Sequence, residues 1–253
     1  MIRNIRDFAW PSALVAMAGL TLALPEPALA QGGDGFLFKT PSVSIKFETG
    51  YGFQRASSEI FDFTLDQLTI GRRDFDSPYV GGEIAFRAAD RWDLFFNIGH
   101  QSSSVASEFR DWVDSDDLPI EQVTELRLIP ATVGAKYYLK ERGRAVGRFA
   151  WIPTSVAPFV GGAVGVMSYR FEQTGDFIDF ETLDVFPDRF ESEGETFLAR
   201  ALAGVNISLS KQFVFTAEGR YGWASGDLGR DFSGFDRMDL DGLQLVGGLA
   251  VRF

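Results

Sequence analysis

The chain contains no cysteine, a single histidine and, after its first thirty residues, no apolar run long enough to form a transmembrane helix. The absence of cysteine excludes disulfides and a lipid anchor attached through cysteine, so packing and hydrogen bonds must hold the fold in an oxidising compartment. There is no second histidine and no glycine-rich phosphate loop before a helix, which removes the commonest catalytic motifs. We expect no cofactor.

Acidic residues outnumber basic residues, and the formal net charge is −11. This argues against a nucleic-acid partner, because such binding depends on neutralising phosphates. The acidic residues are concentrated in two segments, 104–122 and 173–195. The second segment has eight carboxylates and a single arginine. Carboxylate clusters can hold divalent cations, and Asp114, Asp116 and Asp117 come nearest to such a motif. They lack the glycine and distal glutamate of an EF-hand loop, so we expect a solvated acidic surface and no metal.

The first thirty residues have the layout of a secretory signal peptide. Arg3 and Arg6 precede the apolar run 14–24, and Ala28-Leu29-Ala30 is a small-residue cleavage pattern. A membrane-anchoring helix is the alternative, but 11 residues fall short of the roughly 20 needed to span a bilayer. We predict a signal peptide over 1–30 that is cleaved after Ala30, followed by a short segment at 31–41.

Residues 43–54 alternate strictly between two kinds of side chain. One set is mainly apolar or aromatic, and the other is small or polar and includes Lys46 and Glu48. A period of two predicts a strand with one apolar and one polar face. Seven further runs follow the same rule, at 78–87, 92–103, 123–140, 157–172, 196–208, 213–224 and 238–253.

The connections between these runs alternate in length. Those at 88–91 and 209–212 are short, whereas the long ones are 55–77, 104–122, 173–195 and 225–237. Short periplasmic turns alternating with long external loops are typical of outer-membrane barrels. We therefore predict an all-β fold, an eight-stranded antiparallel up-and-down transmembrane β-barrel over 42–253, with both termini in the periplasm. The connection 141–156 is long and basic for its side, and its role stays open.

The C-terminal tail G-G-L-A-V-R-F carries a second indication. Gly248, Val251 and Phe253 resemble the sorting signal that outer-membrane barrels offer to the barrel assembly machinery. Residues 40–253 as a whole resemble the small eight-stranded outer-membrane proteins of the OmpA/OmpX type. The resemblance implies a monomer in contact with outer-membrane lipid and lipopolysaccharide, with a role in envelope integrity, adhesion or ligand contact through its loops.

Parity assigns each side chain of the barrel to lipid or to the interior. Eight strands enclose a space that side chains can fill, and buried charges persist only when they are paired or hydrated. The sequence therefore favours a salt-bridged plug over a small-solute pore. The inward set carries both signs and consists of Lys46, Glu48, Glu83, Arg87, Asp93, Lys136, Arg170, Arg200, Glu218, Arg220 and Arg252.

Three finer expectations follow from the same rule. In the fifth strand, Met167, Tyr169 and Phe171 should face lipid. In the fourth strand the alternation slips at 128–130, which predicts a bulge, because proline cannot donate to the ladder. Aromatic residues near strand ends predict interfacial girdles, formed by Trp92, Trp223, Tyr51, Tyr79, Tyr137, Tyr169 and Phe253.

Two alternatives remain at this stage. His100 and Ser102 share the outward face of the third strand, and this His-x-Ser pair resembles that of the lipid A 3-O-deacylases, which are also eight-stranded barrels. The resemblance would make Ser102 the nucleophile and His100 the general base, whereas the bland interpretation is a polar strand end, and we expect no enzymatic activity. The other alternative is a soluble lipocalin-like barrel, which requires an apolar interior.

Removal of Phe253 tests the sorting signal. If the terminal aromatic residue directs assembly, the truncated protein should insert poorly into the outer membrane, as measured by heat-modifiable gel mobility of the membrane fraction. Unchanged insertion and mobility would contradict the assignment.

Overall fold

The computed structural model describes residues 36–253 except 148, 149 and 180. The predicted signal peptide, its cleavage after Ala30 and the first part of the 31–41 segment lie outside the described residues. Within the described part of the chain, no helix is both long and apolar enough to cross a membrane.

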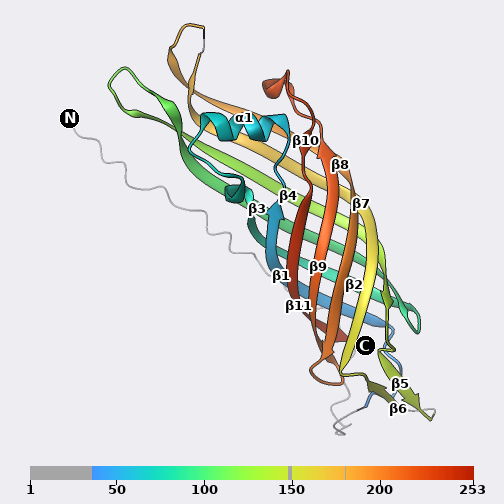
Figure 1. Cartoon of the computed structure of the whole chain (residues 1–253). Helices are drawn as coiled ribbons and strands as arrows, with labels where there is room; N and C mark the ends of the chain where they lie inside the picture. The colour runs from blue at the N-terminus through green and yellow to red at the C-terminus, as the bar shows by residue number, and fades with distance from the viewer. Residues whose placement is uncertain (1–35, 148–149, 180) are drawn as a thin grey trace, which may run out of the picture. The chain divides into compact units, whose positions relative to one another are not determined.

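Eight long antiparallel strands form one closed ring (Figure 1). Each long strand pairs with the next one along the chain, and the last pairs with the first. The structure thus confirms the predicted eight-stranded antiparallel barrel. In ring order the strands are β1 (Val43–Gln54), β2 (Ser77–Ala89), β3 (Trp92–Val113), β4 (Pro119–Tyr138), β7 (Val156–Ile178), β8 (Val185–Ser208), β9 (Phe213–Gly226) and β11 (Gly242–Arg252).

The short elements lie at the two ends of the ring (Figure 1). At one end, called here the long-loop end, are α1 (Glu59–Gln67), η1 (Arg72–Phe75), η2 (Arg230–Phe232) and β10 (Met238–Asp239). At the opposite short-turn end, the long connection 141–156 folds into a hairpin of β5 (Gly143–Val146) and β6 (Ala150–Pro153).

The ring closes between β1 and β11. Their ladder runs without a shift from Ser44 opposite Arg252 to Gln54 opposite Gly242. Beyond it, the backbone N–H of Phe253 donates to the carbonyl of Val43 at 2.8 Å. The C-terminal residue is therefore part of the seam that makes the sheet continuous.

The two faces of the ring have opposite character. Outward side chains are apolar and exposed, as in Phe47 (67%) and Leu245 (52%), whereas inward Lys46 (4%) and Glu48 (0%) are buried. A soluble barrel would bury its apolar face, so this distribution excludes the lipocalin-like alternative and is that of an outer-membrane β-barrel. The parity assignments for β1, β4, β8 and β9 agree with it.

Half of the barrel wall is much taller than the other half. β3, β4, β7 and β8 have 20 to 24 residues, against 11 to 14 for β1, β2, β9 and β11. The predicted loops 104–122 and 173–195 were therefore wrong in extent, because most of their residues belong to these strands. We call the part of β3, β4, β7 and β8 that rises above the short strands the projecting sheet.

Polarity inverts on the projecting sheet. Its inward side chains are apolar, with Met167, Tyr169 and Phe171 at most 4% exposed, while Arg170 lies outside and forms an ion pair with Glu191 at 2.5 Å. The outward placement of the three apolar residues and the inward placement of Arg170 were thus wrong. A strand that has left the membrane meets water on its outer side, so its apolar face turns to the protein.

The predicted bulge at 128–130 is also absent. The β4 ladder keeps one register with β7 from Gln122 to Tyr138 and with β3 from Glu121 to Tyr137. What changes near residue 128 is the polarity of each face. Tyr79 and Tyr169 are buried inside the barrel and do not join an interfacial girdle, whereas Trp92, Trp223, Tyr51 and Phe253 are exposed as expected.

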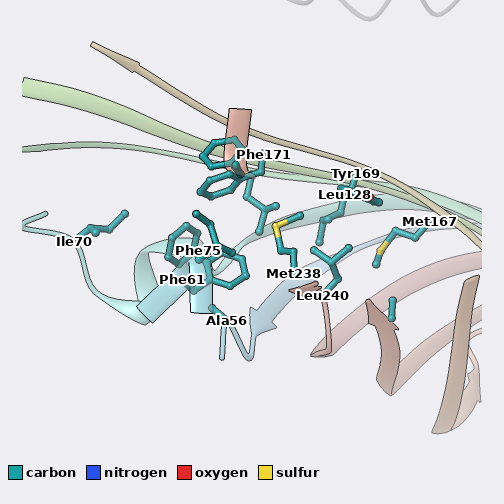
Figure 2. Close-up of a cluster of buried hydrophobic side chains, with 14 of the residues drawn as sticks. Ala56, Phe61, Ile70, Phe75, Leu128, Met167, Tyr169, Phe171, Met238 and Leu240 are labelled. Atoms are coloured by element: carbon teal, nitrogen blue, oxygen red, sulfur yellow. The ribbon is translucent and has the colours of Figure 1, made fainter. Parts of the chain in front are cut away.

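A buried apolar cluster fills the space inside the projecting sheet (Figure 2). Phe61 of α1 contacts the rings of Phe75 and Phe171, with centroids 4.8 and 5.8 Å away. Met238 and Leu240 approach the same group from the β10 side. We call this the mouth cluster, because it lies across the long-loop end of the lumen.

Both edges of the projecting sheet are covered by loop segments. On the β3 edge, Leu68 bridges to Phe109, and the N–H of Thr69 donates to the carbonyl of Glu108 at 2.8 Å. On the β8 edge, the N–H of Gly229 donates to Ser192 Oγ at 2.8 Å, and the N–H of Glu191 donates to a carboxylate oxygen of Asp231 at 3.1 Å.

Arginine substitutions at two outward positions test the membrane boundary. Phe47→Arg should lower the unfolding free energy by about 2–4 kcal/mol, because the charge enters the bilayer. Val123→Arg, on the outward face beyond Glu125 and Arg127, should change it by less than about 0.5 kcal/mol. Urea unfolding midpoints in lipid bilayers measure both, and equal losses would contradict the boundary.

Candidate functional site

A cluster of charged side chains occupies the middle of the lumen. Arg220 of β9 donates two parallel hydrogen bonds to Glu48 of β1, from Nη1 to Oε1 and from Nη2 to Oε2, both 2.7 Å. Its Nε donates to Glu218 on the same strand. Paired N–H bonds of this kind hold a carboxylate in a fixed orientation.

Two lysines complete the cluster. Lys136 of β4 donates to both oxygens of Glu83 at 2.6 and 2.8 Å and lies 3.2 Å from Glu218. Lys46 contacts Glu48, Glu83 and Glu218 at 2.9, 3.1 and 3.6 Å. These side chains are all at most 6% exposed. We call the six residues the central network.

Glycines at inward positions leave space for the side chains of the network. The side chain of Tyr79 is buried inside the barrel, and its hydroxyl donates to Glu48 Oε1 at 2.9 Å. A Cβ on Gly81 or Gly99 would lie within 2.4 Å of that tyrosine side chain. Asn97 of β3 also donates to Glu48, at 2.7 Å. Glycine at inward positions therefore lets longer side chains from other strands meet.

A second polar group lies at the short-turn end. Arg142, from the connection 141–156, contacts both oxygens of Asp93 at 2.5 and 2.7 Å. Tyr138 also donates to Asp93, at 3.1 Å, and Arg252 lies 5.1 Å from the ring centroid of Trp151. Between this group and the central network is a small pocket of about 60 Å³.

Apart from Arg200, the predicted lumen residues fall into three places. Arg87 and Arg252 lie at the short-turn mouth, where their partners are Asp90 and the 208–211 turn. Asp93 also lies there, and Arg170 is outside the barrel. The central network unites Lys46, Glu48, Glu83, Lys136, Glu218 and Arg220.

Arg200 is the exception among the inward charges. It is only 7% exposed, yet among the described residues it has no ion-pair or hydrogen-bond partner. The central lumen holds four cations when Arg200 is included, against the three carboxylates Glu48, Glu83 and Glu218. Its guanidinium is therefore the surplus charge of the interior.

Sequence reasoning missed the residues that close the short-turn end. Trp151 is 3% exposed, and its backbone exchanges hydrogen bonds with Leu37 at 2.7 and 2.9 Å. Arg142 was counted as part of a basic connection without a role. The sequence did offer one indication, because a large apolar side chain such as Trp151 in a connection is usually buried against another part of the protein.

The acidic turns use their carboxylates internally. Asp114 Oδ1 accepts hydrogen bonds from the N–H groups of Asp116 and Leu118 at 2.9 and 2.8 Å. In the 179–184 turn, backbone N–H groups of Glu181 and Thr182 hold the pKa of Asp179 below its usual range. Across the part of the chain that the structure describes, no three metal-ligating side chains converge.

His100 and Ser102 both point outward from β3, near the level where the outer surface turns polar. Neither has a hydrogen-bond partner among the residues described. Glu125, one candidate for an orienting acid, is bound to Arg127 at 2.9 Å.

No family model matches the chain, and no curated protein matches it. Among solved structures it is similar to Neisserial surface protein A, at 13% identity and a TM-score of 0.45, over 85% of this chain and 100% of that one. It is also similar to Ail of Yersinia pestis, in complex with sucrose octasulfate, at 11% identity and a TM-score of 0.43, over 84% of this chain and 99% of that one. The N-terminal barrel of Pseudomonas aeruginosa OprF is similar at 13% identity and a TM-score of 0.35, over 85% of this chain and 100% of that one. Such values are too low to transfer a function, so the fold assignment rests on this chain's own strand pairing.

Two arginine-to-methionine substitutions separate the paired from the unpaired cation. Arg220→Met strands Glu48 and Glu218 without their main partner and should cost about 3–5 kcal/mol. Arg200→Met removes a buried charge with no partner and should be neutral or stabilising. Urea unfolding in lipid gives both values. A larger loss for Arg200→Met would mean that this guanidinium has an important partner.

Proposed function

We propose that the protein is a closed, non-enzymatic outer-membrane barrel with a structural and surface-contact role. The observation that carries the proposal is the central network, which links β1, β2, β4 and β9 across the lumen by ion pairs of 2.6 to 3.6 Å. An ion or solute crossing the barrel would have to separate these pairs in a low-dielectric interior.

Two further closures support a sealed lumen. At the long-loop end the mouth cluster places Phe61, Phe75 and Phe171 over the opening. At the short-turn end Trp151 packs beneath the barrel with Arg142 and Arg252 beside it. Three successive barriers of different chemistry favour a rigid scaffold over a pore.

The outer surface of the projecting sheet is the part available for contacts with other molecules. It carries carboxylates of β7 and β8, and two of these, Glu172 and Glu191, form ion pairs with Arg170 and Arg189. A rigid, charged wall above the membrane suits a role in surface interaction. The lipid A deacylase alternative receives little support, because neither His100 nor Ser102 forms a hydrogen bond among the described residues and Glu125 is bound to Arg127.

Planar-bilayer conductance tests the closed lumen. The refolded mature protein should show no steady current, because the three barriers lie in series. A triple variant that weakens each barrier, Trp151→Gly with Lys46→Gly and Phe61→Gly, should conduct more than wild type, while Leu209→Gly, on an exposed turn, serves as the control. Steady conductance in wild type would overturn the proposal.

The same preparation tests the enzyme alternative. In membranes containing lipopolysaccharide we expect no fatty-acid release, measured by mass spectrometry, from wild type or from Ser102→Ala. Release by wild type that Ser102→Ala abolishes would show a deacylase.

A further inference from the structure

An apolar pocket of about 190 Å³ lies at the long-loop end, beside the mouth cluster. Its walls are the inner face of the projecting sheet, helix α1 and the η2 segment. We call it the mouth pocket. It is separate from the central network, with which it shares no residue.

Phenylalanine dominates the walls of the mouth pocket, which includes seven such residues. Phe177 and Phe190 meet edge to face with centroids 4.5 Å apart, and Phe63 and Phe235 do so at 5.3 Å. Aromatic rings favour such edge-to-face contacts, which a further ring can extend. The walls are therefore suited to an aromatic guest.

Of the five polar side chains that line the pocket, all but Gln67 form hydrogen bonds with protein groups. Gln122 Nε2 donates to the carbonyl of Asp176 at 2.9 Å, and Thr64 Oγ1 donates to the carbonyl of Ile60 at 2.8 Å. Asp231 accepts the N–H of Glu191. Few groups remain to bind water or a polar ligand, so the interior is poorly hydrated. Apolar cavities of roughly 150 Å³ in other proteins stay dry and accept benzene.

The residues around the pocket disfavour a negatively charged ligand. The segment 173–195, which supplies the β7 and β8 walls, carries eight carboxylates and one arginine. A carboxylate ligand would meet repulsion from this field as well as the cost of leaving water. An uncharged molecule meets neither.

We propose that the mouth pocket binds one small uncharged aromatic molecule, of the size of benzene or toluene, from the external side. This goes beyond the structural role and does not depend on the lumen being closed. A conducting barrel that still binds would overturn only the proposed function, and a closed barrel that does not bind would overturn only this inference.

Fluorobenzene is a suitable probe, because its fluorine NMR signal reports binding directly. The mature protein is placed in lipid nanodiscs without detergent, and empty nanodiscs correct for partition into lipid. Gln67→Trp fills the pocket from the last residue of α1. Gln212→Trp makes the same change at the short-turn end and is the matched control. Heat-modifiable gel mobility checks that both variants are folded.

Wild type and Gln212→Trp should bind fluorobenzene saturably at one site, and Gln67→Trp should bind at least about tenfold more weakly, because the ring space is occupied. Benzoate should bind wild type at least about tenfold more weakly than fluorobenzene, owing to its charge. Equal binding by wild type and Gln67→Trp would overturn the site. Equal binding of benzoate, or a stable dimer that excludes the probe, would overturn the assigned ligand class.

Discussion

Closure of the strand ladder between β1 and β11 is the constraint on which the rest of the structure depends. In a bilayer core no water is present to satisfy backbone N–H and C=O groups, so a sheet can cross only if it has no free edge. Here the first and last strands pair over 11 residue positions, and the terminal Phe253 extends the seam. Residues 242–253 therefore complete the barrel wall.

A closed ring of eight strands fixes a narrow interior, and this narrowness governs its chemistry. Side chains from strands that are not neighbours are brought within hydrogen-bond distance, as Glu48 of β1 and Arg220 of β9 show. Opposite charges can then satisfy one another without water. Arg200 departs from this rule, since its partners are all at longer range. The interior is polar at the level of the membrane and apolar above it, which mirrors the change of solvent on the outside.

The period of two was sufficient to predict the number of strands, their order and the inward side chains of β1, β4 and β9. It was insufficient where polarity inverts. In β7, Tyr169 and Phe171 were placed outward because apolar side chains were equated with lipid, although strands above the membrane follow the opposite rule. Nor could pattern alone show that 141–156 folds under the barrel, since the contact of Trp151 with Leu37 joins segments more than 100 residues apart. The sequence was enough to predict that inward charges form ion pairs. It could not predict which residues pair, because that depends on how the strands are staggered around the barrel.

The unequal height of the barrel wall has a consequence for neighbouring molecules. A projecting sheet of four strands that stood bare in water would offer two rows of unsatisfied backbone groups to the same sheet on the next barrel. Segment 65–70 occupies one of these rows, and the η2 segment shields the other with Ser192 and Asp231 as partners. These edge groups are therefore paired within the same chain and are not free, at these positions, to pair with a strand of a second copy.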